Sequence, residues 1–199
     1  MRNTRTQRTR AWATALGLLG ILAIVGVEYA EAARGGQGAA TEHIWVSPLG
    51  FVPEDLTTTL TQSPVNPKAI QVTTSDTTVN HTIQIGLTLP DGAAIGVGSV
   101  KAFQIQQVRL CYEVVVGAVG ASIVSGDIAE MTTPDASTAN SLASAAFPLT
   151  STTPTCADVA LTSPFAVGGA ETLQLVLHFG DTGSAIRLGG LRLDLKVLP

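Results

Sequence analysis

The side chains that most often carry out catalysis are scattered along this 199-residue chain. The three histidines, His43, His81 and His178, stand far apart, and none belongs to an H-x-H or H-E-x-x-H pattern, which would bring two imidazoles to one metal ion. Gly120-Ala121-Ser122 begins like the G-x-S-x-G turn of serine hydrolases, but Val124 replaces the second glycine. These patterns predict neither a metalloenzyme nor a serine hydrolase.

Glycosidases use a pair of carboxylates, and no predicted strand carries two close carboxylates on the same face. Asp127 and Glu130 are three residues apart, so a regular strand places them on opposite faces. We therefore expect no catalytic residues and no enzymatic activity. A hydrolase whose acidic residues converge only in the folded chain stays open as an alternative.

Carboxylate oxygens at turns are the ligands that calcium prefers, and several aspartates lie at or near predicted turns. Their spacing matches neither an EF-hand nor an RTX repeat, and turn aspartates usually bond to their own backbone. We expect no metal site and no cofactor. The aspartates in question are Asp91, Asp127, Asp135, Asp158 and Asp181.

One aromatic side chain is a candidate ligand contact. A sugar-binding sheet needs an aromatic platform on a solvent-facing side, and Trp45 is the only tryptophan after residue 32. It alternates with Ile44 and Val46, which predicts a position that is exposed or at a sheet margin. Tyr112 lies in phase with Leu110 and is expected in the core instead.

The first 32 residues have the three parts of an export signal. Residues 1–10 hold four arginines, residues 11–27 are a charge-free apolar run, and Ala30 and Ala32 form the small-x-small pattern before a cleavage site at Ala33. An uncleaved membrane anchor is the alternative, because 17 apolar residues lie at the lower limit for spanning a bilayer. Either way, we expect a secreted, periplasmic or cell-surface protein.

The two cysteines, Cys111 and Cys156, both follow this segment. In an oxidising compartment such a pair is usually a disulfide, which here would close a loop of 46 residues. A metal site is the alternative, but neither cysteine has a histidine at ligand spacing. We therefore predict a Cys111–Cys156 disulfide.

The charge balance argues against nucleic acid as a partner. From Ala33 onward the chain has seven basic and thirteen acidic residues, a net charge of −6. A protein that binds the phosphate backbone needs a basic stripe, which this sequence lacks. Contact with a membrane is expected only through the N-terminal segment, if that segment stays uncleaved.

Period-two alternation dominates the chain from His43 onward and predicts an all-β, antiparallel, two-sheet sandwich of the jelly-roll kind. The alternation is strictest over residues 173–179 and 191–197. A short strand over residues 186–188 and the pair Gly189-Gly190 lie between these two segments. Over 103–116 it slips by one residue at Gln106-Gln107, which predicts a β-bulge.

The expected organisation is a signal over residues 1–32, a flexible leader over 33–42 and one β-sandwich domain over 43–199. Within the domain, residues 131–155 are rich in Ser, Thr, Ala and Pro and predict a long surface connection or a presented binding loop.

No motif identifies the ligand or the partner. The sequence favours a non-enzymatic secreted or surface protein that binds or assembles, with a small carbohydrate-binding module using Trp45 as the first alternative. Charged residues are only 13% of the chain, and Val115 and Val176 fall at outward-facing positions. We therefore also expect a homo-oligomer.

Overall fold

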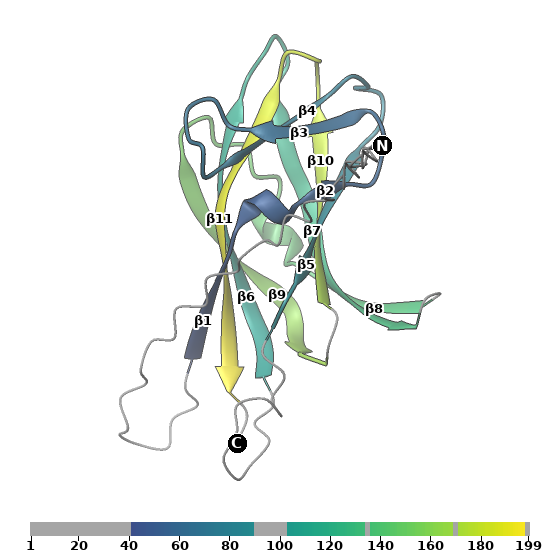
Figure 1. Ribbon diagram of the computed structural model, residues 1–199, viewed down its shortest axis with the longest axis vertical. Coiled ribbons are helices and arrows are strands. Elements are labelled where there is room, and N and C mark those ends of the chain that lie inside the picture. The colour runs from purple at the N-terminus through teal and green to yellow at the C-terminus, as the bar shows by residue number, and fades with distance from the viewer. Residues whose placement is uncertain (1–40, 90–102, 134–135, 169–170, 198–199) are drawn as a thin grey trace, which may run out of the picture.

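The computed structural model describes residues 41–89, 103–133, 136–168 and 171–197 (Figure 1). The export signal and its cleavage site at Ala30, Ala32 and Ala33 lie outside the described residues. The last two residues expected in the leader, Thr41 and Glu42, already belong to the first strand. No helix among the described residues is long and apolar enough to cross a membrane.

Eleven strands and two short 3-10 helices make up the described part of the chain. The helices are η1 (Pro48–Gly50) and η2 (Ser144–Ala146). The strands are β1 (Thr41–Val46), β2 (Val52–Pro53), β3 (Thr58–Gln62), β4 (Ile70–Thr74), β5 (His81–Leu87), β6 (Phe103–Val115), β7 (Ala121–Thr133), β8 (Ala136–Ser141), β9 (Thr155–Ala166), β10 (Glu171–Phe179) and β11 (Ala185–Val197).

The strands form two antiparallel sheets that pack face to face, as the sequence predicts (Figure 1). Sheet A has the order β3-β4-β11-β6-β9, with β1 pairing with the C-terminal half of β11, and sheet B has the order β2-β5-β10-β7-β8. From β4 onward the chain passes repeatedly between the sheets, and the orders 4-11-6-9 and 5-10-7-8 are those of a jelly roll.

The core lies between the sheets and is built from the in-phase apolar side chains of each strand. Leu173, Leu175 and Leu177 of β10 are fully buried, and Leu193 and Leu195 of β11, in the other sheet, are buried in the same core cluster. Burying each such side chain contributes roughly 1.5–3 kcal/mol. The alternate residues of the same strands face solvent, so each sheet offers one outer face.

Two β-bulges interrupt the pairing of β6 with β11 in sheet A. The first is at Gln106, where the register against β11 shifts between Asp194 and Leu195, which confirms the bulge predicted from the phase slip. The second was not expected: Gly189 and Gly190 together oppose Cys111, and they lie inside one continuous strand, β11, rather than between two strands.

The connection expected over residues 131–155 is less irregular than its composition suggests. It contains the end of β7, the whole of β8 and the helix η2. β8 pairs with β7 and lies beside β9, where the Ser163 hydroxyl donates to Asn140 Oδ1 at 2.8 Å and the Thr162 hydroxyl to the Ser141 carbonyl at 3.1 Å. The segment therefore closes one side of the sandwich.

Candidate ligand-binding site

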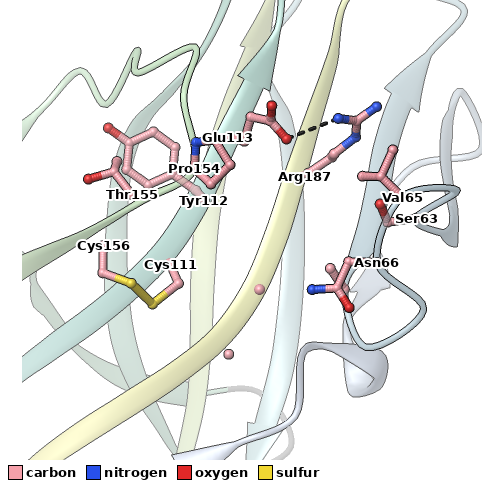
Figure 2. Close-up of a pocket in the computed structure, with 13 residues that line it drawn as sticks. Ser63, Val65, Asn66, Cys111, Tyr112, Glu113, Pro154, Thr155, Cys156 and Arg187 are labelled. Carbon is pink, nitrogen blue, oxygen red and sulfur yellow. Dashed lines mark hydrogen bonds and ion pairs between the residues drawn. A yellow bond between two sulfur atoms is a disulfide. The ribbon is translucent and has the colours of Figure 1, made fainter.

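A hollow of about 380 Å³ opens on the outer face of sheet A, between the β3–β4 turn and the start of β9 (Figure 2). Four separate parts of the chain meet there, and all of them come from sheet A or its connections. We call this feature the hollow. Its lining residues are Ser63, Val65, Asn66, Ala69, Cys111, Tyr112, Glu113, Pro154, Thr155, Cys156, Arg187, Gly189 and Gly190.

The floor of the hollow is the glycine bulge of β11. Because Gly189 and Gly190 carry no side chains, the outer face of the sheet is open at this point. A Cβ atom on Gly190 would lie 3.6 Å from Cε3 and Cζ3 of Trp45, so the indole ring borders the hollow. Neither glycine has a φ in the left-handed region, so their backbone accepts other residues without strain.

Trp45 is on β1 with 47% of its surface exposed, as its alternation with Ile44 and Val46 predicts. Its cross-strand partner is Arg192 of β11, whose guanidinium carbon lies 5.8 Å from the centroid of the indole ring. Two hydrogen bonds, of 2.7 and 3.0 Å, hold this guanidinium to Asp194. The arginine and its carboxylate therefore support the ring while leaving about half of it open to solvent.

The predicted disulfide is confirmed and forms one wall of the hollow. Cys111 of β6 and Cys156 of β9 are directly opposite in register, with an S–S distance of 2.02 Å. It fixes the edge strand β9 to the inner strand β6, and Pro154 and Thr155 just before Cys156 extend the wall (Figure 2). A disulfide is typical of proteins that fold in an oxidising compartment outside the cytoplasm.

An ion pair stands at the upper end of the hollow. Arg187 donates from Nη1 to Glu113 Oε2 at 2.9 Å and from Nε to Gln71 Oε1 at 3.2 Å (Figure 2). The side chains of Arg187 and Glu113 are 19% and 22% exposed, so both reach the surface of the hollow. Among the described lining residues they are the only charged ones, and their charges cancel.

The wall opposite the disulfide is the β3–β4 turn, which presents Ser63 and Asn66. The turn is held by the Ser63 N–H donating to the Ala69 carbonyl at 2.9 Å and by Asn66 Oδ1 accepting from the Lys68 N–H at 3.0 Å. Ser63 is only 4% exposed, and its hydroxyl has no hydrogen-bond partner among the described residues. Buried hydroxyls normally have one, so this group keeps its full bonding capacity for a further contact.

The histidines do not come together. His43 contacts Asp194 at 2.8 Å on the outer face of sheet A, and His178 is exposed on sheet B, as its phase predicts. His81 is 1% exposed, with Nδ1 3.1 Å from Asp55 Oδ2 and its ring packed edge-on against Phe179. His81 is in phase with the buried face of β5, which is the sequence signal for its position.

The acidic residues singled out in the sequence do not converge on one another, although Glu130 of β7 lies directly opposite Glu171 of β10 in register. Asp127 faces outward opposite Gln174, where burial raises the pKa of its carboxyl, and Glu130 lies on the opposite face of β7. Asp181 bonds to its own turn and accepts from the Gly183 and Val119 N–H groups. Among the described residues, no three His, Cys, Asp or Glu side chains are placed to hold a metal ion. Asp91 and Asp135 lie outside those residues.

Sequence reasoning identified Trp45 and both cysteines but missed the rest of the hollow. The glycine pair inside an otherwise alternating strand was the available signal, since glycine in a strand often marks a bulge or an open surface. Ser63, Glu113 and Arg187 carry no comparable signal, because their neighbourhood depends on the pairing of β3, β6 and β11.

No family model matches this sequence, and no curated protein is similar to it. Similar solved structures include the Cry4Aa toxin of Bacillus thuringiensis (10% identity, TM-score 0.40) and a Bacillus thuringiensis Cry1Da tryptic core variant (14%, 0.33). Another is the Arthrobacter globiformis isomalto-dextranase in complex with panose (13%, 0.33). The matches cover 79%, 75% and 77% of this chain and 24%, 23% and 23% of those chains, respectively.

Proposed function

We propose that the protein is an exported, non-enzymatic binding domain that holds a carbohydrate across the outer face of sheet A. The observation that carries the proposal is the half-exposed Trp45 ring beside a hollow with a glycine floor. An exposed indole offers a flat apolar surface of the kind on which the apolar face of a sugar ring stacks. The hollow next to it offers hydrogen-bonding groups for the hydroxyls.

The lining of the hollow supports binding rather than catalysis. Glu113 is the only carboxylate among the described lining residues, and Arg187 holds it in an ion pair. A glycosidase needs two carboxylates on either side of the scissile bond, and a hydrolase of another kind needs a nucleophile beside a base. The described part of the hollow provides neither arrangement.

Export is the second part of the proposal. The arginine-rich start, the apolar run and the alanines at positions 30, 32 and 33 support translocation and cleavage, and the Cys111–Cys156 disulfide fits the same compartment. The domain would then act in the periplasm, at the cell surface or in the medium. Polysaccharides are available to it in each of these places.

Replacing Trp45 tests the proposal directly. We expect Trp45→Ala to lower the affinity for a bound polysaccharide about ten-fold or more, because stacking and apolar burial by one aromatic contribute roughly 1–3 kcal/mol. Affinity electrophoresis in gels containing hydroxyethylcellulose, galactomannan or arabinoxylan measures the change. Leu49→Ala is the matched control, since Leu49 is similarly exposed but lies outside the hollow.

Unchanged binding by Trp45→Ala would show that the ligand does not use this face. If the wild-type protein is not retarded by any of the three polysaccharides, the carbohydrate proposal is wrong.

A further inference from the structure

We propose that the hollow is a subsite for one uncharged sugar unit, whose hydroxyls bond to Ser63 and to the Arg187–Glu113 pair. This inference rests on the proposed function and goes further, because it assigns a second contact site and a ligand charge. The neighbouring unit of the same ligand would stack on Trp45, which borders the floor at Gly190.

The unpartnered Ser63 hydroxyl is the first observation. Its residue is 4% exposed and lines the hollow, and its backbone N–H is already bonded to Ala69, while the hydroxyl has no partner among the described residues. A buried hydroxyl without a partner is unfavourable, and rotation of the Ser63 side chain towards the hollow would let a ligand hydroxyl supply that partner. The site is therefore built for a ligand with a hydrogen-bonding group at this depth.

The Arg187–Glu113 pair is the second observation. A guanidinium has five N–H donors and a carboxylate has about four acceptor positions, so the 2.9 Å contact leaves both partners with further capacity. One hydroxyl of a sugar can donate to Glu113 while its neighbour accepts from Arg187. Two adjacent hydroxyls match this donor and acceptor set.

The charge of the hollow determines which sugars fit. Arg187 is already engaged by Glu113 and Gln71, so a carboxylated sugar would find no free cation among the described lining residues. It would also place a second carboxylate beside Glu113. The hollow therefore selects uncharged sugars over uronic acids.

The size of the hollow limits the ligand to one unit. Its volume of about 380 Å³ is at the lower end of small-molecule pockets, which span roughly 300–1,000 Å³. The disulfide and the β3–β4 turn restrict it on two sides. One ring fits between these walls, and the rest of a longer chain has to continue over Trp45.

Filling the floor tests the subsite while Trp45 itself is kept. A Cβ at Gly190 makes only ordinary contacts, the nearest with the Trp45 ring at 3.6 Å, so Gly190→Val should fold and fill the floor beside that ring. We expect it to weaken binding of the retained neutral polysaccharide at least ten-fold. Gly86→Val is the matched control, because Gly86 is exposed on sheet B with nothing within 4 Å of its Cβ position.

Two further variants test the chemistry. Ser63→Ala should weaken binding of the same polysaccharide about three- to ten-fold, as the loss of one hydrogen bond does. Glu113→Gln frees Arg187, so it should increase the retardation by polygalacturonate relative to the neutral polysaccharide. Circular dichroism and melting temperature confirm that each variant is folded.

The outcomes separate this inference from the proposed function. If Gly190→Val and Ser63→Ala bind as tightly as the wild type while Trp45→Ala does not, the subsite is wrong and the proposed function stands. Wild-type preference for polygalacturonate over the neutral polysaccharides would overturn the charge assignment. If every variant, including Trp45→Ala, binds as tightly as the wild type, both the subsite and the proposed function are wrong.

Discussion

At the scale of single residues, His81 has the most unusual surroundings. Its side chain is completely buried, with Nδ1 facing Asp55 Oδ2 at 3.1 Å and Nε2 facing the Asp76 carbonyl at 2.6 Å. Both ring nitrogens thus lie within hydrogen-bonding distance of oxygen atoms. The Thr74 hydroxyl lies 3.1 Å from Nε2, and the cluster joins the start of β5 to the β2–β3 loop.

Asp55 is the partner that ties this cluster to the backbone. Burial alone would raise the pKa of its carboxyl, but hydrogen bonds from Thr57, His81 and Thr58 outweigh burial and hold that pKa well below the ordinary value of 3.8. A carboxyl with a lowered pKa in the folded state stabilises the fold once it is ionised. Its contribution is complete above the pKa of the unfolded chain and is lost as the pH falls towards the lowered pKa.

We expect Asp55→Asn to lower the free energy of unfolding at pH 7 by about 1–3 kcal/mol, because His81 loses its charged partner. The variant should also lose less stability than the wild type between about pH 5 and pH 2. The stability of the variant should still decrease with falling pH, since the pKa values of Asp76 and Asp181 are lowered as well. Urea denaturation across this pH range measures both effects.

Glu54→Gln is the control for this experiment, because Glu54 is adjacent in sequence but exposed, and among the described contacts its side chain bonds only to Gln174. Equal acid sensitivity in Asp55→Asn and the wild type would contradict the role of Asp55.

At the scale of elements, the pairing of β6 with β9 determines the shape of the hollow. β9 is an edge strand of sheet A, and its register against β6 shifts between Gln107 and Ile105, where residues 161–164 of β9 oppose Gln106 alone before pairing resumes. The disulfide holds its other end, where Cys156 opposes Cys111. An edge strand without this link would rely on its backbone hydrogen bonds to β6.

Removing the disulfide should therefore affect stability and β9 in particular. We expect Cys111→Ala/Cys156→Ala to lower the free energy of unfolding by about 2–5 kcal/mol, since the link closes a long loop in the unfolded chain. The rate of amide hydrogen exchange should increase most over residues 155–160. Chemical denaturation and exchange measured by mass spectrometry test the two expectations.

Intact mass provides the control: the wild-type protein should be two hydrogen atoms lighter before reduction than after it. Two thiols that react with an alkylating agent in the native protein would contradict the disulfide.

At the scale of the whole molecule, the sandwich has open sheet edges as well as two outer faces. The edge strand β8, with the sequence ASTANS, contains no charged residue and no proline, which are the usual protection against pairing with another chain. Val115 and Val176, which motivated the expectation of an oligomer, are half-buried within the chain. Asn140 and Ser141 bond to β9, so the edge of β8 before Asn140 is the better basis for self-association.

We expect the domain to self-associate through β8. The substitution Ala139→Lys, at an exposed position of that strand, should make the domain monomeric. A lysine at an edge strand disfavours pairing because its charge would be buried against the second chain. Light scattering over a concentration series measures the mass. Thr88→Lys adds the same charge outside the edge strands, and a strictly monomeric wild type would contradict the prediction.

The alternation of apolar and polar residues was enough to predict β6, β10, β11, the sandwich and the bulge at Gln106, because each depends on neighbours a few residues away. The disulfide followed from composition and compartment. The burial of His81 was visible in its phase with Ile83, although its partner Asp55 was not. The extent of β8 was missed because its small polar residues carry little pattern.

By itself, then, the sequence determined the fold class, the Cys111–Cys156 pair and the solvent-facing position of Trp45, since local periodicity decides which face of a strand each side chain occupies. Only the tertiary structure decided that the ring of Trp45 borders a hollow. That hollow exists because β11 lies between β4 and β6, which brings Ser63, Glu113 and Arg187 around the side-chain-free Gly189-Gly190 bulge. Strand order depends on long-range pairing, which no short segment of the chain encodes.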